Sequence, residues 1–174
     1  MTFFGSSFGC TTLPQPDAPL AERKETAANS LRVVGLNLYN RPWERKKRLY
    51  RALESFEELG ADVLALQEVS TGWILPGDPV ELFSERLGMH FARFWHETNL
   101  GIFKTGLAIL SRYPIESSEY HHFERYPFWD TKGYMLARIQ TPHGLLQVVN
   151  VHLASTRDLE LTATPIHQRR LFEL

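Results

Sequence analysis

Cysteine is almost absent from this sequence, which has one, Cys10, among 174 residues. A single cysteine excludes an internal disulfide framework and a cysteine-rich zinc site. The chain also has no apolar run near the ~20 residues that a membrane-spanning helix needs. The chain has no large excess of charge of either sign, since the formal net charge is −1. This balance argues against tight nonspecific binding to DNA, although a local basic surface could still contact nucleic acid.

Residues 1–30 lack a clear strand or helix period and are rich in Ser, Thr, Pro and Ala. We therefore expect a flexible leader. The junction of Gly9 with Cys10 follows a short apolar stretch and looks like the lipidation site of a bacterial lipoprotein. No basic residue precedes that stretch, as a signal peptide would require. Two interpretations stay open: a cell-envelope protein attached to the membrane through a lipidated Cys10, or a cytoplasmic protein with a chance cysteine.

The remainder, residues 31–174, has the ordinary size and composition of one soluble domain. Residues 31–38 and 62–69 read as strands and residues 41–60 as the helix between them, so we expect a β-α-β unit with parallel strands. An apolar stripe is expected on that helix, formed by Trp43, Leu49, Leu53, Phe56 and Leu59. Its opposite face is strongly basic, and we interpret that face as solvated rather than as a nucleic-acid surface.

The later pattern predicts a short helix at 78–88 and strands at 90–97, 105–112 and 115–123, the last at a sheet edge. Residues 124–131 form an aromatic loop. Strands at 132–140 and 144–153 are separated by a tight turn and predict a hairpin. A final helix is expected from Thr164, its N-cap, to residue 174.

Polar side chains end three of these apolar strands. Asn37 ends the first, Glu68 ends the second, and Asn150 and His152 end the last. Asn150 and His152 are two residues apart, so they share a face of their strand. Ligands gather outside the carboxyl ends of strands in α/β sheets, and an amide, a carboxylate and an imidazole suit a hard divalent cation and a phosphate. Each residue alone could be a simple surface strand end; together they indicate a site.

Five segments resemble the endonuclease/exonuclease/phosphatase superfamily, the fold of pancreatic DNase-like nucleases, in their order and spacing. They are VVGLNLYN, DVLALQEV, GLAILSRYPI, KGYMLARI and VVNVHLAS. The resemblance implies an α/β protein (α+β in some schemes), a DNase I-like two-sheet sandwich with flanking helices. It also implies cleavage of phosphate esters with Mg²⁺ or Mn²⁺.

The same resemblance assigns roles to individual residues. Glu68 would bind the metal and Asn37 would assist it, while His152 would contact the scissile phosphate with support from Asn150. Lys132 and Arg138 could add positive charge near the phosphate; for Arg138 we favour an ordinary surface cation. The adjacent pair His121 and His122 face opposite sides of a strand and form a poor chelate.

The chain lacks the Gly-Asp-x-Asn and Ser-Asp-His motifs that belong to the second half of such enzymes. It therefore resembles the N-terminal half alone, and we expect it to be inactive and to expose the apolar inner face of a sheet unless a second chain or the missing half completes it. Nucleic acid, a phospholipid and a small phosphodiester all remain candidate substrates. The alternative is a degenerate, non-catalytic binding module of the same fold.

Overall fold

The computed structural model describes residues 30–39, 41–98, 102–123 and 132–153, which form two helices and seven strands. In chain order these elements are β1 (Val33–Asn37), α1 (Arg45–Leu59), β2 (Val63–Thr71), α2 (Pro79–Leu87), β3 (His90–Thr98), β4 (Phe103–Ser111), β5 (Ile115–His122), β6 (Gly133–Thr141) and β7 (Gly144–His152). The strand and helix predictions are confirmed within this part of the chain. Almost all of the expected leader, the aromatic loop and the final helix lie outside the described residues.

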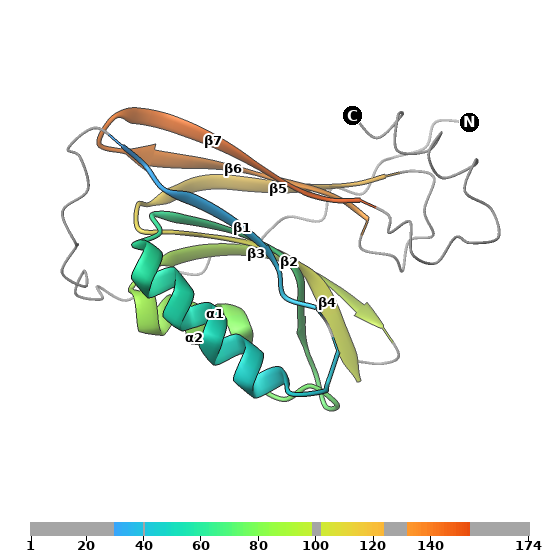
Figure 1. Ribbon diagram of the computed structural model, residues 1–174. Helices are drawn as coiled ribbons and strands as arrows, with labels where there is room; N and C mark the ends of the chain where they lie inside the picture. The colour runs from blue at the N-terminus through green and yellow to red at the C-terminus, as the bar shows by residue number, and fades with distance from the viewer. Residues whose placement is uncertain (1–29, 40, 99–101, 124–131, 154–174) are drawn as a thin grey trace, which may run out of the picture.

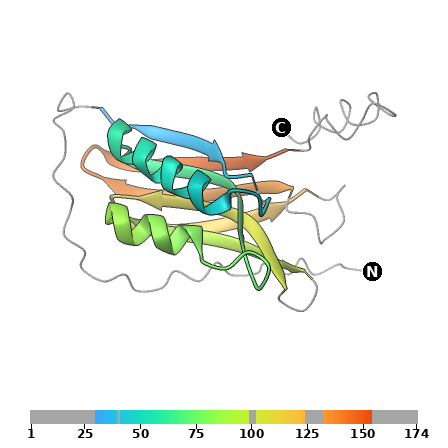
Figure 2. The ribbon, with the colours of Figure 1, turned by 60° about the horizontal axis from the view of Figure 1, so that its bottom comes forward.

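The elements stack in three layers (Figures 1 and 2). A four-stranded sheet in the order β1-β2-β4-β3 lies in the middle. Helices α1 and α2 cover one of its faces, and a three-stranded sheet, β5-β6-β7, covers the other. The two sheets form the expected sandwich with flanking helices.

The buried strand β2 contributes to both hydrophobic cores. Val63, Leu64 and Leu66 are fully buried, because side chains on both faces of this strand are covered. Leu64 and Leu66 pack in the core beneath the helices, while Val63 packs in the core between the sheets. β2 runs parallel to β1 and antiparallel to β4, which confirms the predicted β-α-β unit.

Helix α1 buries the centre of its predicted stripe but not the ends. Leu49, Leu53 and Phe56 are buried, whereas Trp43 is 80% exposed and Leu59 is 50% exposed. Trp43 was wrongly placed because it precedes the first helical residue, so the helical period does not orient it. Leu59 is the last helical residue, directly before the left-handed Gly60 that ends the helix as predicted.

The inner faces of the two sheets cover each other. Met135, Ala137 and Ile139 of β6 are fully buried against Leu107 and Ile109 of β4. The expectation that this half exposes the inner face of its sheet is therefore wrong for the described residues. The reason is that both layers of the sandwich already come from this segment of the chain.

The described sheets have edge strands on both sides of the sandwich: β3 and β5 on one side, and β1 and β7 on the other. Among the described strands, β1 pairs only with β2 and β7 pairs only with β6, and the two edges lie on the same side in Figure 2. Their exposed apolar side chains include Val33 (51%), Leu145 (50%) and Val149 (54%). The described helices include none long and apolar enough to cross a membrane.

Candidate metal and phosphate site

Glu68 lies at a bulge that turns it out of the ladder of β2. Leu66 pairs with Ala108 and Val69 pairs with Gly106, so two residues of β2 oppose one residue of β4 between these pairs. Glu68 takes a left-handed backbone conformation there, with φ 51°. A bulge of this kind re-aims a side chain. It brings the Glu68 carboxylate to the end of β1 instead of leaving it in the pleat.

Asn37 holds that carboxylate from the neighbouring strand. Its Nδ2 donates a hydrogen bond to Glu68 Oε1 at 3.0 Å. Its Oδ1 accepts a hydrogen bond from the backbone N–H of Tyr39 at 2.9 Å, which closes a local turn. In this arrangement the amide oxygen of Asn37 is engaged by the backbone, so Asn37 orients Glu68.

His152 reaches the same carboxylate from the other sheet. Its Nε2 lies 3.8 Å from Glu68 Oε1, and the side chain is 8% exposed. Lys132 Nζ lies 3.0 Å from the same Nε2. Lys132 directly precedes β6, where Gly133 pairs with His152, and this pairing brings the lysine to the imidazole. A lysine ammonium can only donate, so this contact requires His152 Nε2 to accept.

Asn150 points the same way as His152 but lies deeper, with 1% of its surface exposed. Its Nδ2 donates to the carbonyl oxygens of Leu66 and Ala108 at 2.9 and 3.1 Å. Its Oδ1 accepts a hydrogen bond from Gln67 Nε2. Asn150 thus ties β7 to the β2–β4 pair at the bulge that carries the adjacent Glu68, which is a supporting position. Sequence reasoning missed Gln67, although a polar residue directly before Glu68 in an apolar strand was a usable signal.

Arg138 does not join this group. Its side chain is exposed on β6, where it pairs with Gln147, five residues along the strand from Gly133. This placement separates Arg138 from the other candidate side chains, and its contact with substrate stays a prediction. His121 is exposed, and its Nε2 lies 3.4 Å from Glu119 Oε2. Its ring stacks on the ring of Tyr134.

The donors at the site fit a hard cation that keeps most of its own water. Within the described ranges, no three His, Cys, Asp or Glu side chains gather as a closed metal cage. Mg²⁺ commonly binds through one or two carboxylates, with waters and substrate phosphate completing the shell. The Glu68 carboxylate, which accepts a hydrogen bond from Asn37 and lies 3.8 Å from His152 Nε2, matches that requirement.

These layers and strand-end side chains define a class: a DNase I-like two-sheet sandwich with its polar site where the two sheets meet. The model of the Endonuclease/Exonuclease/phosphatase family matches residues 34–143, more than half of the chain. The chain belongs to this family, whose members act on phosphate esters. The match includes Asn37 and Glu68, and the resemblance seen in the sequence is confirmed.

Solved structures show the same fold at low sequence identity. An endonuclease/exonuclease/phosphatase family protein from Leptotrichia buccalis is 13% identical with a TM-score of 0.58, covering 82% of this chain and 62% of that one. Sphingomyelinase C from Streptomyces griseocarneus is 19% identical with a TM-score of 0.56, covering 74% of this chain and 51% of that one. TDP2 from Caenorhabditis elegans is 17% identical with a TM-score of 0.58, covering 80% and 39%. This chain therefore spans under two thirds of each. No curated protein sequence matches it.

Proposed function

We propose that this chain carries half of the active centre of a Mg²⁺- or Mn²⁺-dependent phosphoesterase that hydrolyses a phosphodiester or phosphomonoester. The observation that supports the proposal most is the approach of Glu68 Oε1 to His152 Nε2 at 3.8 Å. These two side chains come from different sheets, and a bulge and a buried amide position them. Such an arrangement is hard to explain as a surface strand end.

The residues divide the work as follows. Glu68 would hold the cation, which when bound supplies positive charge that polarises the phosphoryl oxygens. His152 would contact the scissile phosphate, and Lys132, whose Nζ lies beside the imidazole, would add a positive charge there. Asn37 keeps the carboxylate in place, and Asn150 fixes the strand that carries His152.

We further propose that the chain is inactive by itself. Its sequence lacks the Gly-Asp-x-Asn and Ser-Asp-His motifs, and it spans 62% of the Leptotrichia protein and 51% of the sphingomyelinase. A phosphoesterase needs a group that activates the attacking water in addition to the metal ligand. A second half, in the same polypeptide or in another, would supply that group and pair with the open edges β1 and β7.

The substrate is nucleic acid, a phospholipid or a small phosphodiester. The near-neutral charge of the chain favours one of the latter two over a long polyanion. Lipidation of Cys10 would attach the enzyme to the cell envelope, and otherwise the protein would be cytoplasmic.

The alternative is a degenerate binding module that keeps the fold without catalysis. The linked side chains of Asn37, Glu68 and His152 favour an enzyme over this alternative.

A metal-binding measurement tests the site without requiring activity. We expect the purified chain to bind Mn²⁺, detected by electron paramagnetic resonance, and Glu68→Gln to weaken the affinity at least about tenfold, because the carboxylate assigned to the metal is lost. Glu116→Gln, a change of an exposed carboxylate on β5, is the matched control and should have no effect. Equal Mn²⁺ affinity of the Glu68→Gln variant and the parent chain would refute the assignment.

An activity measurement separates enzyme from binding module. The chain is assayed alone and together with a polypeptide that supplies the missing motifs, with bis-p-nitrophenyl phosphate, plasmid DNA and sphingomyelin in parallel. We expect turnover only in the completed form, and its loss in Glu68→Gln. Turnover by the chain alone at ordinary enzyme rates would contradict the proposed inactivity. Substrate binding without turnover in the completed form, unchanged by Glu68→Gln, would establish the binding module.

A further inference from the structure

The loop that follows β2 exposes two large apolar side chains at its tip. Trp73 is 85% exposed and Ile74 is 55% exposed, while the next residue, Leu75, is buried. Gly72 and Leu75 form a β-bridge, and a Cβ on Gly72 would lie 2.5 Å from the carbonyl oxygen of Ile102. The tip is therefore anchored at its base, and its exposed side chains are held outward.

A second exposed tryptophan lies at the start of α1. Trp43 is 80% exposed, and the guanidinium of Arg48 donates to its carbonyl oxygen and to those of Tyr39 and Arg41. Arg45, one turn earlier, donates to the carbonyl oxygen of Ser70 in β2 and to those of Pro76 and Gly77 in the other loop. Two arginines of one helix thus pin both loops that carry the exposed tryptophans.

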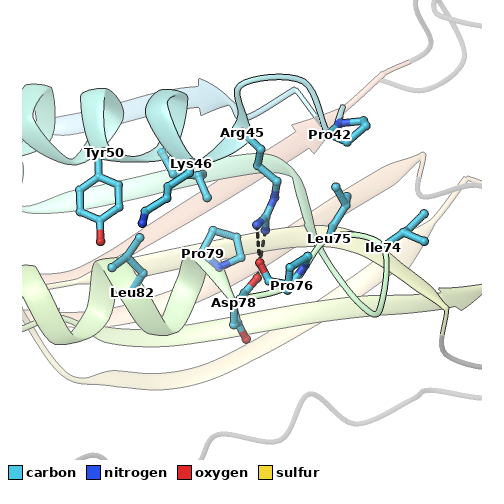
Figure 3. A pocket seen from close by; sticks show the side chains of 12 residues that line it. Pro42, Arg45, Lys46, Tyr50, Ile74, Leu75, Pro76, Asp78, Pro79 and Leu82 are labelled. Carbon is cyan, nitrogen blue, oxygen red and sulfur yellow. Dashed lines mark hydrogen bonds between the residues drawn. The ribbon is translucent and has the colours of Figure 1, made fainter.

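A groove joins these two loops (Figure 3). Its volume is about 450 Å³, and Pro42, Tyr50, Ile74 and Leu82 line it together with Lys46. In Figure 3, Arg45 points into the loop at Pro76, whereas Lys46 lies along the groove between Tyr50 and Leu82. The groove is therefore apolar along its walls and bears a cation at its rim. We name the surface formed by Trp43, Trp73, Ile74, this groove, Lys46 and Lys47 the tryptophan corner.

The charges of α1 are arranged against the stability of the helix. Exposed cations lie before it and in its first two turns, and acidic residues follow in its last turns. The cations are Arg41, Lys46, Lys47 and Arg51; the acids are Glu54, Glu57 and Glu58. The first turn contains no acidic residue and the last turn no basic one. The helix dipole favours the opposite order within the helix, although the N-cap residue Glu44 lies where an acid is favourable and pairs with Lys47 at 3.6 Å. The exposed cations of the first turns would suit an anionic partner at the tryptophan corner.

We propose that the tryptophan corner is a docking surface for a bilayer that contains anionic lipids. Exposed tryptophans and isoleucine beside lysines are the composition of proteins that lie in the membrane interface, where the aromatic rings enter the headgroup region and the cations meet anionic headgroups. The corner adjoins the candidate active centre, since one small cavity is lined by both Arg45 and Glu68. Docking there would bring Glu68 close to the lipid surface. The inference concerns binding and stands independently of the proposed catalysis.

Nucleic acid is the other polyanion that a basic surface could bind. Ile74 favours the bilayer, because its aliphatic side chain adds apolar area in the headgroup region but offers no aromatic face on which a base can stack. Burial in the headgroup region would use Ile74 and both tryptophans, which are the most exposed large apolar side chains at the corner.

Vesicle co-sedimentation in the presence of EDTA tests the proposal. The full chain carries Cys10→Ser, so that lipidation cannot contribute. We expect binding to vesicles of phosphatidylcholine with phosphatidylglycerol, and weaker binding to phosphatidylcholine alone. The pair Trp73→Ala with Ile74→Ala should reduce partitioning at least about tenfold on the mixed vesicles, because it removes the apolar contact. Leu145→Ala with Val149→Ala, a matched loss of exposed apolar surface on β7, should have no effect.

A separate set of variants tests the electrostatic contribution of the lysines to vesicle binding. Lys46→Ala with Lys47→Ala should reduce binding about tenfold on the mixed vesicles and little on phosphatidylcholine, whereas Arg138→Ala should change neither. Trp73→Phe, a milder change, should reduce the blue shift of tryptophan emission that vesicles induce, and Trp43 should account for the remainder. The proposal is overturned by failure of the chain to bind mixed vesicles, by equal binding of the Trp73 and Ile74 variant, or by binding to oligonucleotides alone.

Discussion

Removal of the Asn150 side chain amide tests how the two sheets are held together at the candidate site. Its Nδ2 donates to the carbonyl oxygens of Leu66 and Ala108, and its Oδ1 accepts from Gln67, all away from solvent. Each such hydrogen bond contributes about 1 kcal/mol net, and a buried partner left without one costs as much or more. Asn150→Ala should therefore lower the free energy of unfolding by about 3 kcal/mol, a large share of the ~5–15 kcal/mol of a typical domain.

Urea unfolding followed by circular dichroism measures this change. Gln147→Ala, on the same strand but exposed, is the control and should change the free energy of unfolding by less than about 0.5 kcal/mol. Asn150→Asp should be worse than alanine at neutral pH, because a buried carboxylate would face two carbonyl oxygens. The excess cost should shrink at low pH, where the protonated carboxyl can donate. A cost below about 1 kcal/mol for alanine would show that this amide does not join the sheets.

Two further changes test the local geometry. Asp78 caps α2 by accepting from the N–H of Val80, so Asp78→Ala should cost about 1–2 kcal/mol, while Asp78→Asn should retain most of the cap. Burial raises the pKa of Asp78, although the positive charge of Arg93 opposes this shift. The folded state therefore holds the proton more tightly than the unfolded state, and the contribution of Asp78 to the free energy of unfolding should fall as pH rises from its ordinary pKa through the raised one. Asp78→Asn should remove this pH dependence in urea titrations. A Cβ on Gly106 would collide with the backbone of β3, so Gly106→Ala should cost at least about 2 kcal/mol by thermal unfolding. Gly35→Ala, where a Cβ has ordinary room, should be neutral or slightly stabilising.

The strands were predictable because their signals are local. Burial on both faces of β2 appears in the sequence as an unbroken apolar run, and the β6–β7 hairpin appears as alternation on either side of a tight turn. The same alternation predicts that Arg138, which lies between the buried Ala137 and Ile139, faces outward from the sandwich.

The site was only partly predictable because its geometry depends on pairing between distant segments. Residue types pointed to Glu68 and His152, but their approach follows from a bulge that only the register of β2 against β4 reveals. Lys132 reaches His152 through the pairing of β6 with β7, twenty residues apart in the chain. The predicted burial of Trp43 was wrong because the helical period does not determine the orientation of a residue that precedes the helix.

The backbone of Glu68 offers a last test of the link between fold and function. A non-glycine residue with φ 51° pays about 1–2 kcal/mol for the left-handed conformation. Glycine avoids this penalty, although its greater freedom in the unfolded chain costs about 0.5–1 kcal/mol. Both Glu68→Gly and Glu68→Ala lose the hydrogen bond from Asn37, so that loss cancels when they are compared.

We therefore expect Glu68→Gly to be more stable than Glu68→Ala by about 1 kcal/mol in urea unfolding, while both lose Mn²⁺ affinity. If alanine equals or exceeds glycine, residue 68 is not held in the left-handed region and the bulge does not aim the carboxylate. If glycine is the more stable and metal binding is lost, a residue that costs stability occupies this position because of its carboxylate. In that outcome the chemistry of the site would explain the glutamate, since selection for stability alone would have placed glycine at the bulge.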